Sequence, residues 1–376
     1  MFRSRAMMYL VLFALHLFIG LSVIGDLGLT PAAQLPFWAL LLLSFVLVPL
    51  GFRSRDMNSR LLAWAALIAM GVFSSLAVFS LLRGLVVALA SLIGQPLDAA
   101  WRVGSAWAVL GLVLLVALRS VYNARRTARV KEVELALPSL PSGLDGLRIV
   151  QLSDLHIGPT IKAGYLQRIV DRVNGLDADL VAITGDLVDG SVAELQHEFL
   201  PLQGLKARLG TYAITGNHEY YSGAEAWVRA WRDQGLTVLL DEHRVLQHQG
   251  TPFVLAGITD YSAPLYVPSH RSDAAAAFAG TPEGLFRLLL AHQPRSAPKA
   301  EAAGADLQLS GHTHGGQFWP WMHFVRLQQP WVAGIHRLGR LTVYISRGTG
   351  YWGPPLRFGA PSEITLVRLR RGERQQ

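Results

Sequence analysis

The chain has 376 residues, of which 51% are hydrophobic and only 16% are charged, with a formal net charge of +8 at pH 7. This length allows one large domain or two of moderate size, and the apolar excess argues against a plain soluble globule. There is no cysteine, which excludes disulfides and thiolate metal sites. Since the second half has no basic stripe interleaved with aromatic residues, we expect no nucleic-acid partner.

Most of the apolar excess lies in residues 1–121, which we interpret as a transmembrane unit. Four segments approach the roughly 20 residues that cross a bilayer core of about 30 Å. The predicted spans are residues 7–24, 36–50, 61–82 and 105–121. Gly84–Ile93 is apolar but too short to cross, so we predict that it is interfacial or re-entrant. His16, inside the first span, is expected to pack between helices rather than to act in function.

Arginine and lysine placement predicts the orientation of these spans. Basic residues precede the first span, lie between the second and third, and follow the fourth, whereas the other two connections contain only Arg83 and Arg102. The basic set is Arg3, Arg5, Arg53, Arg55, Arg60, Arg119, Arg125, Arg126, Arg129 and Lys131. The positive-inside rule therefore places both termini in the cytoplasm. We expect a multi-pass protein of the inner (cytoplasmic) membrane whose second half faces the cytoplasm.

Residues 122–146 are predicted to be a juxtamembrane linker with a first strand at Val130–Leu137, and residues 147–376 to form a domain. The expected strands are Leu147–Leu152, Leu180–Thr184, Thr211–Thr215, Pro252–Ile258, Leu285–Ala291, Leu307–Ser310, Leu341–Ser346 and Ile364–Leu369. The expected helices are Gly164–Leu176, Val192–Leu205 and Ala224–Asp233. Early strands separated by helices indicate layered α/β structure, and later closely spaced strands indicate a second sheet. We predict an α/β fold with a four-layer α/β/β/α two-sheet sandwich.

Five of these strands are followed by side chains that can bind a metal ion. The residues at the strand ends are Asp154, His156, Asp186, Asn217, His218, Glu219, His292, His312 and His314. Open α/β sheets place ligands at the carboxyl ends of their strands. Imidazole, carboxylate and amide groups without thiolates favour Mn²⁺, with Fe or Zn²⁺ as alternatives, over a structural zinc cage.

Each of these residues has a plainer interpretation when it is taken alone. Asp154 and Asp186 could cap helices after their loops, and His292 could be a hydrogen-bonded core histidine. Their joint appearance at five strand ends favours a single site. The remaining histidines lack this context, and we expect them at the surface or in packing contacts: His197, His243, His248, His270, His323 and His336.

The ordered motifs resemble those of the calcineurin-like metallophosphoesterase superfamily. The resemblance covers about residues 130–370 and is carried by Asp154-x-His156, Gly185-Asp186, Gly216-Asn217-His218-Glu219, His292 and Gly311-His312-Thr-His314. Longer stretches are similar to the bacterial membrane-associated branch, which includes proteins linked to UDP-2,3-diacylglucosamine pyrophosphate hydrolysis. These stretches are Leu152–Gly158, Gly311–Gln317 and Gly348–Pro355.

The resemblance implies a site for two divalent metal ions. One cation would be held by Asp154, His156 and His314, the other by Asn217, His292 and His312, and Asp186 would bridge them. The implied reaction is direct attack of a bridging hydroxide on a phosphodiester or pyrophosphate, without a covalent enzyme intermediate.

Further residues have implied or open roles around this site. His218 would contact the scissile phosphate and assist the leaving group, since an imidazole can carry a proton near neutral pH. Glu219 and Asp189 could orient the ligands or be solvated loop acids. Arg295 is expected to be a surface arginine rather than a phosphate ligand.

We expect a membrane-anchored, metal-dependent phosphoesterase, and the anchor favours a lipid-linked substrate because it concentrates the enzyme at the membrane surface. The partners are then this substrate and the membrane. One alternative is a non-catalytic scaffold or regulatory domain of a membrane protein, which missing ligands would favour, but no ligand is missing. Another alternative is a transporter or sensor, against which the few ionisable residues inside the spans argue.

Overall fold

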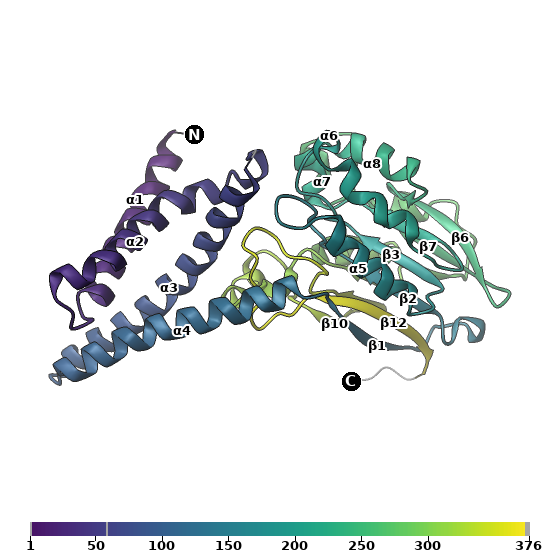
Figure 1. Ribbon diagram of the computed structural model, residues 1–376. Coiled ribbons are helices and arrows are strands. Elements are labelled where there is room, and N and C mark those ends of the chain that lie inside the picture. Colours follow the sequence, from purple (N-terminus) through teal and green to yellow (C-terminus); the bar gives the residue numbers. More distant parts are fainter. Residues whose placement is uncertain (1, 58, 373–376) are drawn as a thin grey trace. The chain divides into compact units, whose positions relative to one another are not determined.

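A computed structural model describes residues 2–57 and 59–372 (Figure 1). The chain divides into two compact units. One comprises Met1–Tyr122 with Gly353–Leu356, and the other comprises Asn123–Trp352 with Arg357–Gln376.

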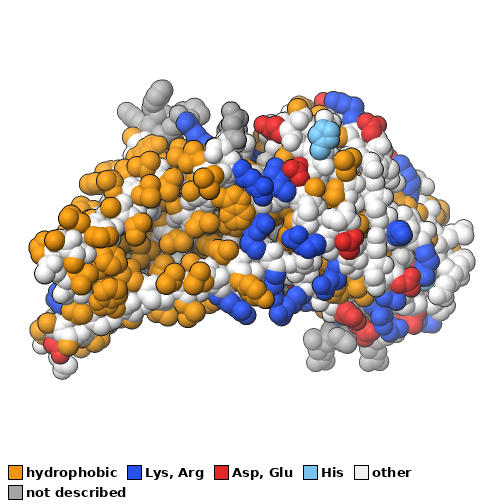
Figure 2. Space-filling view, in the orientation of Figure 1, with side chains coloured by type: hydrophobic (Ala, Val, Ile, Leu, Met, Phe, Trp, Pro, Cys, Tyr) orange, Lys and Arg blue, Asp and Glu red, His pale blue; other side chains and the backbone are white. Residues whose placement is uncertain are grey.

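The first unit is built from four long apolar helices. They are α1 (Phe2–Ile19), which continues as a π-helical turn (Gly20–Ile24), α2 (Pro31–Gly51), α3 (Arg60–Leu92) and α4 (Ala99–Arg125). All four are long and apolar enough to cross a membrane, which confirms the predicted helical unit. Hydrophobic side chains cover the face of these helices that Figure 2 presents.

Gly84–Ile93 was predicted to be interfacial or re-entrant. A separate re-entrant segment is wrong, because α3 continues through it to Leu92. Nothing in this stretch interrupts the helix until Gly94, which has a φ of +73°. At a rise of about 1.5 Å per residue, α3 is longer than a bilayer core of about 30 Å.

Arg83 and Arg102 lie within α3 and α4, not in a connecting loop as predicted. The Arg83 guanidinium pairs with the Asp26 carboxylate at 2.6 Å and donates to Ser105 Oγ at 2.8 Å. A buried charge needs such partners in an apolar unit. His16 stacks on Phe73, with ring centroids 4.1 Å apart, in agreement with the expected packing role.

The second unit contains two six-stranded mixed sheets. The order of the first sheet is β1 (Arg129–Leu137), β12 (Glu363–Arg371), β2 (Arg148–Leu152), β3 (Leu180–Thr184), β4 (Thr211–Ile214) and β5 (Thr237–Val238). The order of the second is β10 (Gly334–Leu338), β11 (Leu341–Ile345), β9 (Leu307–Ser310), β8 (Phe286–Leu290), β7 (Thr251–Gly257) and β6 (Glu242–His248). The helices are α5 (Ala163–Asn174), α6 (Val192–Leu195), α7 (Asn217–Ser222), α8 (Ala224–Asp233), α9 (Ala274–Phe278) and α10 (Ala297–Ala302).

The two sheets pack face to face and have helices on their outer faces. Along β3, Leu180 and Ala182 belong to the core between the sheets, whereas Val181 and Ile183 pack in the cluster that includes α5 and α8. A third cluster joins the outer face of the second sheet to α9 and α10. Because both faces are covered, the central strands are continuous apolar runs. The predicted α/β/β/α sandwich is confirmed.

Local departures from the prediction have identifiable causes. Only Val192–Leu195 of the expected helix is α-helical, and a 3₁₀ stretch follows over Gln196–Gly204, where Pro201 cannot donate a backbone hydrogen bond. The short strand β5 and the half-exposed strands β6 and β10 were not predicted. The strand expected at Val130–Leu137 is β1, and it pairs in parallel with β12.

Candidate metal centre

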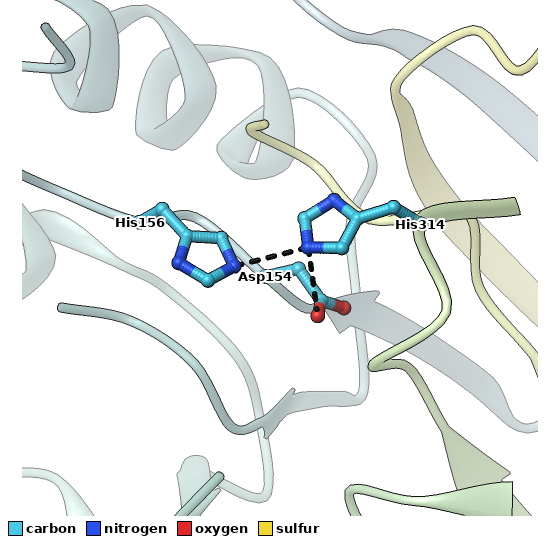
Figure 3. A group of neighbouring side chains, drawn as sticks. All are labelled: Asp154, His156 and His314. Carbon is cyan, nitrogen blue, oxygen red and sulfur yellow. Dashed lines mark hydrogen bonds and ion pairs between the residues drawn. The ribbon is translucent and has the colours of Figure 1, made fainter. Parts of the chain in front are cut away.

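The candidate residues come from five loops that follow β2, β3 and β4 of one sheet and β8 and β9 of the other. Asp154, His156 and His314 form a first group whose ligand atoms all lie within 4.8 Å of one another. His314 Nε2 is 3.0 Å from His156 Nε2 and 3.4 Å from Asp154 Oδ1. Figure 3 shows the two rings directed toward each other beside the carboxylate. All three side chains are buried.

Asp186, His292 and His312 form a second group of the same kind. His292 Nε2 is 3.1 Å from Asp186 Oδ2 and 3.2 Å from His312 Nδ1. The same Asp186 oxygen is 3.8 Å from His156 Nε2 in the first group. Asp186 therefore lies between the two groups, where a ligand shared by two cations would have to be.

The backbone directs these side chains toward one another. Asp154, His156, Asp186, His312 and His314 have φ values of 54°, 50°, 53°, 70° and 51°. These values lie in the left-handed region, which non-glycine residues adopt rarely and which costs of order 1–3 kcal/mol per residue at functional sites.

Two glycines permit the close approach of the loops. A Cβ added to Gly216 would overlap Asp186 Oδ1, and one added to Gly311 would overlap Asp154 Oδ2. A larger residue than glycine at position 216 or 311 would therefore collide with one of the two carboxylates.

Asn217 is the first residue of α7, and the N–H of the next residue, His218, donates to Asp186 Oδ1 at 2.8 Å. Asn217 Oδ1 is buried and has no hydrogen-bond partner among the described residues. Leaving a buried acceptor unsatisfied costs about 1–3 kcal/mol. A cation would satisfy this oxygen, so the residues present fit a metal ion.

Outer contacts orient the imidazoles. His292 Nδ1 donates to the Thr184 carbonyl oxygen at 2.8 Å, and His156 Nδ1 lies 3.2 Å from Asp189 Oδ2. In both rings Nε2 is then the nitrogen that faces the other candidate ligands, the arrangement typical of metal-binding histidines.

The pKa values of the candidate ligands shift in both directions. Burial opposes the charged form of His292, but the Asp186 carboxylate outweighs it and raises the pKa of His292 well above its usual value. Burial lowers the pKa of His312 to about 3 and that of His314 well below its usual value, so both rings are neutral and have a free lone pair. Burial opposes ionisation of Asp186, but the His292 and His218 rings hold its pKa well below the ordinary range. Burial raises the pKa of Asp154, and a bound cation would lower it.

His218 and Asp189 form a buried pair at the edge of the site. His218 Nδ1 is 2.5 Å from Asp189 Oδ1, and its Nε2 is 3.9 Å from Asp186 Oδ2. Although burial raises the pKa of Asp189, the His218 and His156 rings outweigh it and hold that pKa below its usual range. The interpretation of Asp189 as a solvated acid is therefore wrong. The pair orients His218 with Nε2 toward the candidate ligand Asp186.

Glu219 is fully buried, so the interpretation as a solvated acid is wrong for this residue too. Its carboxylate accepts from the backbone N–H groups of Gly216 at 2.6 Å, Leu187 at 2.8 Å, Asp186 at 2.9 Å and Val188 at 3.2 Å. Burial raises its pKa to about 8, whereas the four donors favour the anion. Glu219 thus joins the loop after β3 to the loop after β4.

Sequence reasoning missed Arg357, which is fully buried. Its guanidinium donates to the carbonyl oxygens of His314 at 2.7 Å and Arg347 at 2.8 Å, and lies 3.0 Å from His314 Nδ1. Burial lowers its pKa to about 10. Its position two residues after the Gly348–Pro355 motif is the signal that could have identified it.

Aromatic side chains lie close to His218. The rings of Tyr221 and Trp352 lie 5.2 Å and 5.9 Å from its ring, and Tyr266 lies 5.5 Å from Tyr221. The Gln317 amide holds the Trp352 backbone, accepting from its N–H at 2.9 Å and donating to its carbonyl at 2.8 Å. We call Tyr221, Tyr266 and Trp352 the aromatic rim.

Residues expected outside the site are placed as follows. Arg295 is half-buried rather than at the surface, and its guanidinium lies 4.2 Å from the centre of the Tyr261 ring. Among the other histidines, His336 stacks on Trp331, and the Tyr220 hydroxyl lies 2.7 Å from His270 Nδ1. His197 and His323 are exposed.

Comparison with known proteins gives consistent results. A family model for the calcineurin-like phosphoesterases matches residues 147–316. A Danio rerio protein named transmembrane protein with metallophosphoesterase domain is 38% identical, over 82% of this chain and 74% of its own length. A Bos taurus protein of the same name is 36% identical, over 72% of this chain and 67% of its own length. An uncharacterized metallophosphoesterase from Campylobacter jejuni is 36% identical, over 70% of this chain and 68% of its own length.

Replacing Glu219 by Gln should weaken metal binding by about 10–100-fold, the usual effect of losing an outer partner of metal ligands. The new NH₂ group would face backbone N–H donors, which would separate the loops that carry Asp186 and Asn217. Titration of the metal-free protein with Mn²⁺ measures this effect. Glu225→Gln, an exposed position on α8, is the control, and equal Mn²⁺ affinity in both variants would contradict the assigned role.

Proposed function

Because the chain belongs to the calcineurin-like metallophosphoesterase family, we propose that it cleaves a phosphodiester or pyrophosphate bond in a lipid-linked substrate. The family makes it a metal-dependent phosphoesterase hydrolase. Its four apolar helices make it a multi-pass membrane protein, as the names of two relatives also indicate.

The position of Asp186 is the observation that carries the proposed ligand set. Its Oδ2 lies within 4 Å of an imidazole nitrogen from each group, which supports Asp186 as the ligand shared by two cations.

The remaining ligands are Asp154, His156 and His314 for one cation, and Asn217, His292 and His312 for the other. When bound, two divalent cations supply an activated hydroxide and neutralise charge on the phosphoryl oxygens. The oxygen and nitrogen ligands favour Mn²⁺, with Fe or Zn²⁺ as alternatives.

His218 is proposed to donate a proton to the leaving oxygen. Its Nδ1 is occupied by Asp189 at 2.5 Å, which fixes the ring and leaves Nε2 as the atom that can reach a substrate. A donor positioned in this way stabilises the developing alkoxide as the bond to phosphorus breaks. Asp189 positions this imidazole and stabilises its charged form.

The lipid-linked substrate is supported by two features of the chain. The aromatic rim presents half-exposed rings beside His218, and aromatic rings can contact both apolar chains and the polar groups of an interface. The four spans also hold the enzyme in the membrane that contains such a substrate. A compound such as UDP-2,3-diacylglucosamine combines the required chemistry, since its pyrophosphate joins a nucleoside to an acylated sugar.

With Mn²⁺, the purified protein should hydrolyse a generic aryl phosphodiester, and Asp186→Ala or Asn217→Ala should abolish turnover because each variant loses a ligand. Release of the aryl alcohol and the stoichiometry of bound Mn²⁺ would be measured together. Exposed His197→Ala is the control and should retain full activity. Persistent turnover in both ligand variants would contradict the proposed two-metal site.

Replacing His218 by Ala should reduce turnover by about 10²–10⁴-fold, the usual contribution of a proton donor, while Mn²⁺ binding is retained. Esters whose leaving groups need no protonation should lose less activity than esters with alkyl leaving groups. A uniform loss across both kinds of ester would contradict the role of a proton donor.

We propose that the second unit faces the cytoplasm. The connection between α2 and α3 contains Arg53 and Arg55, whereas residues 25–30 and 93–98, which connect the other helix pairs, contain no arginine or lysine. The positive-inside rule then orients the spans. A reporter that is active only in the cytoplasm, fused after Gln376, should be active. An inactive fusion, together with activity of a reporter that requires export, would show that the second unit lies on the other side of the membrane.

A further inference from the structure

The segment after the metal-bearing His314 loop forms consecutive turns with a three-residue repeat. The N–H of Trp321 donates to the Phe318 carbonyl at 3.0 Å, that of Phe324 to the Trp321 carbonyl at 2.9 Å, and that of Leu327 to the Phe324 carbonyl at 3.0 Å. In such 3₁₀ geometry, side chains three residues apart lie in line. Trp321, Phe324 and Leu327 therefore form one row, which we call the apolar ridge. Their exposed fractions are 43%, 51% and 85%.

Both ends of this segment are fixed to loops of the metal centre. A Cβ on Gly316 would overlap the backbone of Met322, so the start of the ridge lies directly against the loop that holds His314. At the other end, the buried Gln329 donates to Gln293 Oε1 at 3.0 Å and accepts from the Arg295 N–H at 3.2 Å. Gln293 follows His292 directly. The ridge is thus attached to both groups of ligands.

The stretch of sequence that contains the ridge carries charged side chains of one sign. Between Asp306 and Glu363 the sequence contains no aspartate or glutamate. Arg326 lies within the ridge segment and is exposed. The other arginines of this stretch are Arg337, Arg340, Arg347 and Arg357. Of these, Arg340 pairs with Asp306 at 3.3 Å and Arg357 is buried, so Arg326 is the arginine of the ridge itself. Exposed tryptophan, phenylalanine and leucine side chains with an exposed arginine among them are a composition that binds the interface of an anionic bilayer.

The chain also keeps this unit close to a membrane, because only Arg126–Ala128 separate the end of α4 from the start of β1. We infer that the apolar ridge inserts into the headgroup region of an anionic bilayer and holds the metal centre at the lipid surface. This surface is an interaction site in addition to the four spans. The inference does not require the hydrolysed substrate to be a lipid.

The absence of cysteine allows a direct test in the full-length chain. Leu327→Cys, and separately Phe324→Cys, would be labelled with a polarity-sensitive fluorophore and reconstituted in bilayer discs that contain anionic lipid. We expect blue-shifted emission and about a twofold fall in intensity with nitroxide-labelled lipids, since interfacial side chains lie roughly 5–10 Å into the headgroup and acyl boundary. Val245→Cys is the control. Val245 is 46% exposed and lies on β6, the edge of the second sheet opposite to β10, so its label should show the emission of a fluorophore in water.

Labels at positions 324 and 327 that behave like the label at Val245 would overturn the inference. A blue-shifted label that nitroxide lipids do not quench would also overturn it, because the ridge would then pack on protein, such as a second copy of the chain. The fluorescence does not depend on turnover. Failure of this inference is therefore distinguishable from failure of the proposed hydrolysis.

Discussion

The site depends on how the backbone turns at the end of each buried strand. Asp154, His156, Asp186, His312 and His314 all have left-handed backbone conformations, which direct their side chains into one volume. Such conformations cost of order 1–3 kcal/mol each and persist only where the surrounding structure compensates. Here the compensation comes from the two-sheet core and from buried groups that hold the loops.

Two buried side chains that are not in the candidate ligand set, Glu219 and Arg357, make many of the bonds that hold these loops. Glu219 accepts four backbone N–H groups from the loops after β3 and β4, and Arg357 donates to carbonyl oxygens that include that of His314. Each is buried, and a buried polar group is tolerated when it is hydrogen-bonded. The loops are therefore held in place by bonds that do not use the ligand atoms, which leaves those atoms available for cations.

The membrane-embedded unit, the aromatic rim and the apolar ridge give the chain a consistent organisation. The four helices restrict the enzyme to a lipid surface, the rim presents aromatic rings beside His218, and the ridge extends from the loop that carries His314. The proposed lipid-linked substrate and the proposed bilayer contact of the ridge both agree with these features.

The sequence alone determined the apolar helices and the two sheets, which follow from hydrophobic period, and it placed the candidate ligands at strand ends. It could not decide whether Glu219 and Asp189 are buried, because loop acids look alike until the neighbouring loops are in place. Nor could it show what Arg357 contacts, or that Trp321, Phe324 and Leu327 form a row. Their roles depend on contacts with the His314 loop and on a three-residue turn geometry, and only tertiary packing brings those about.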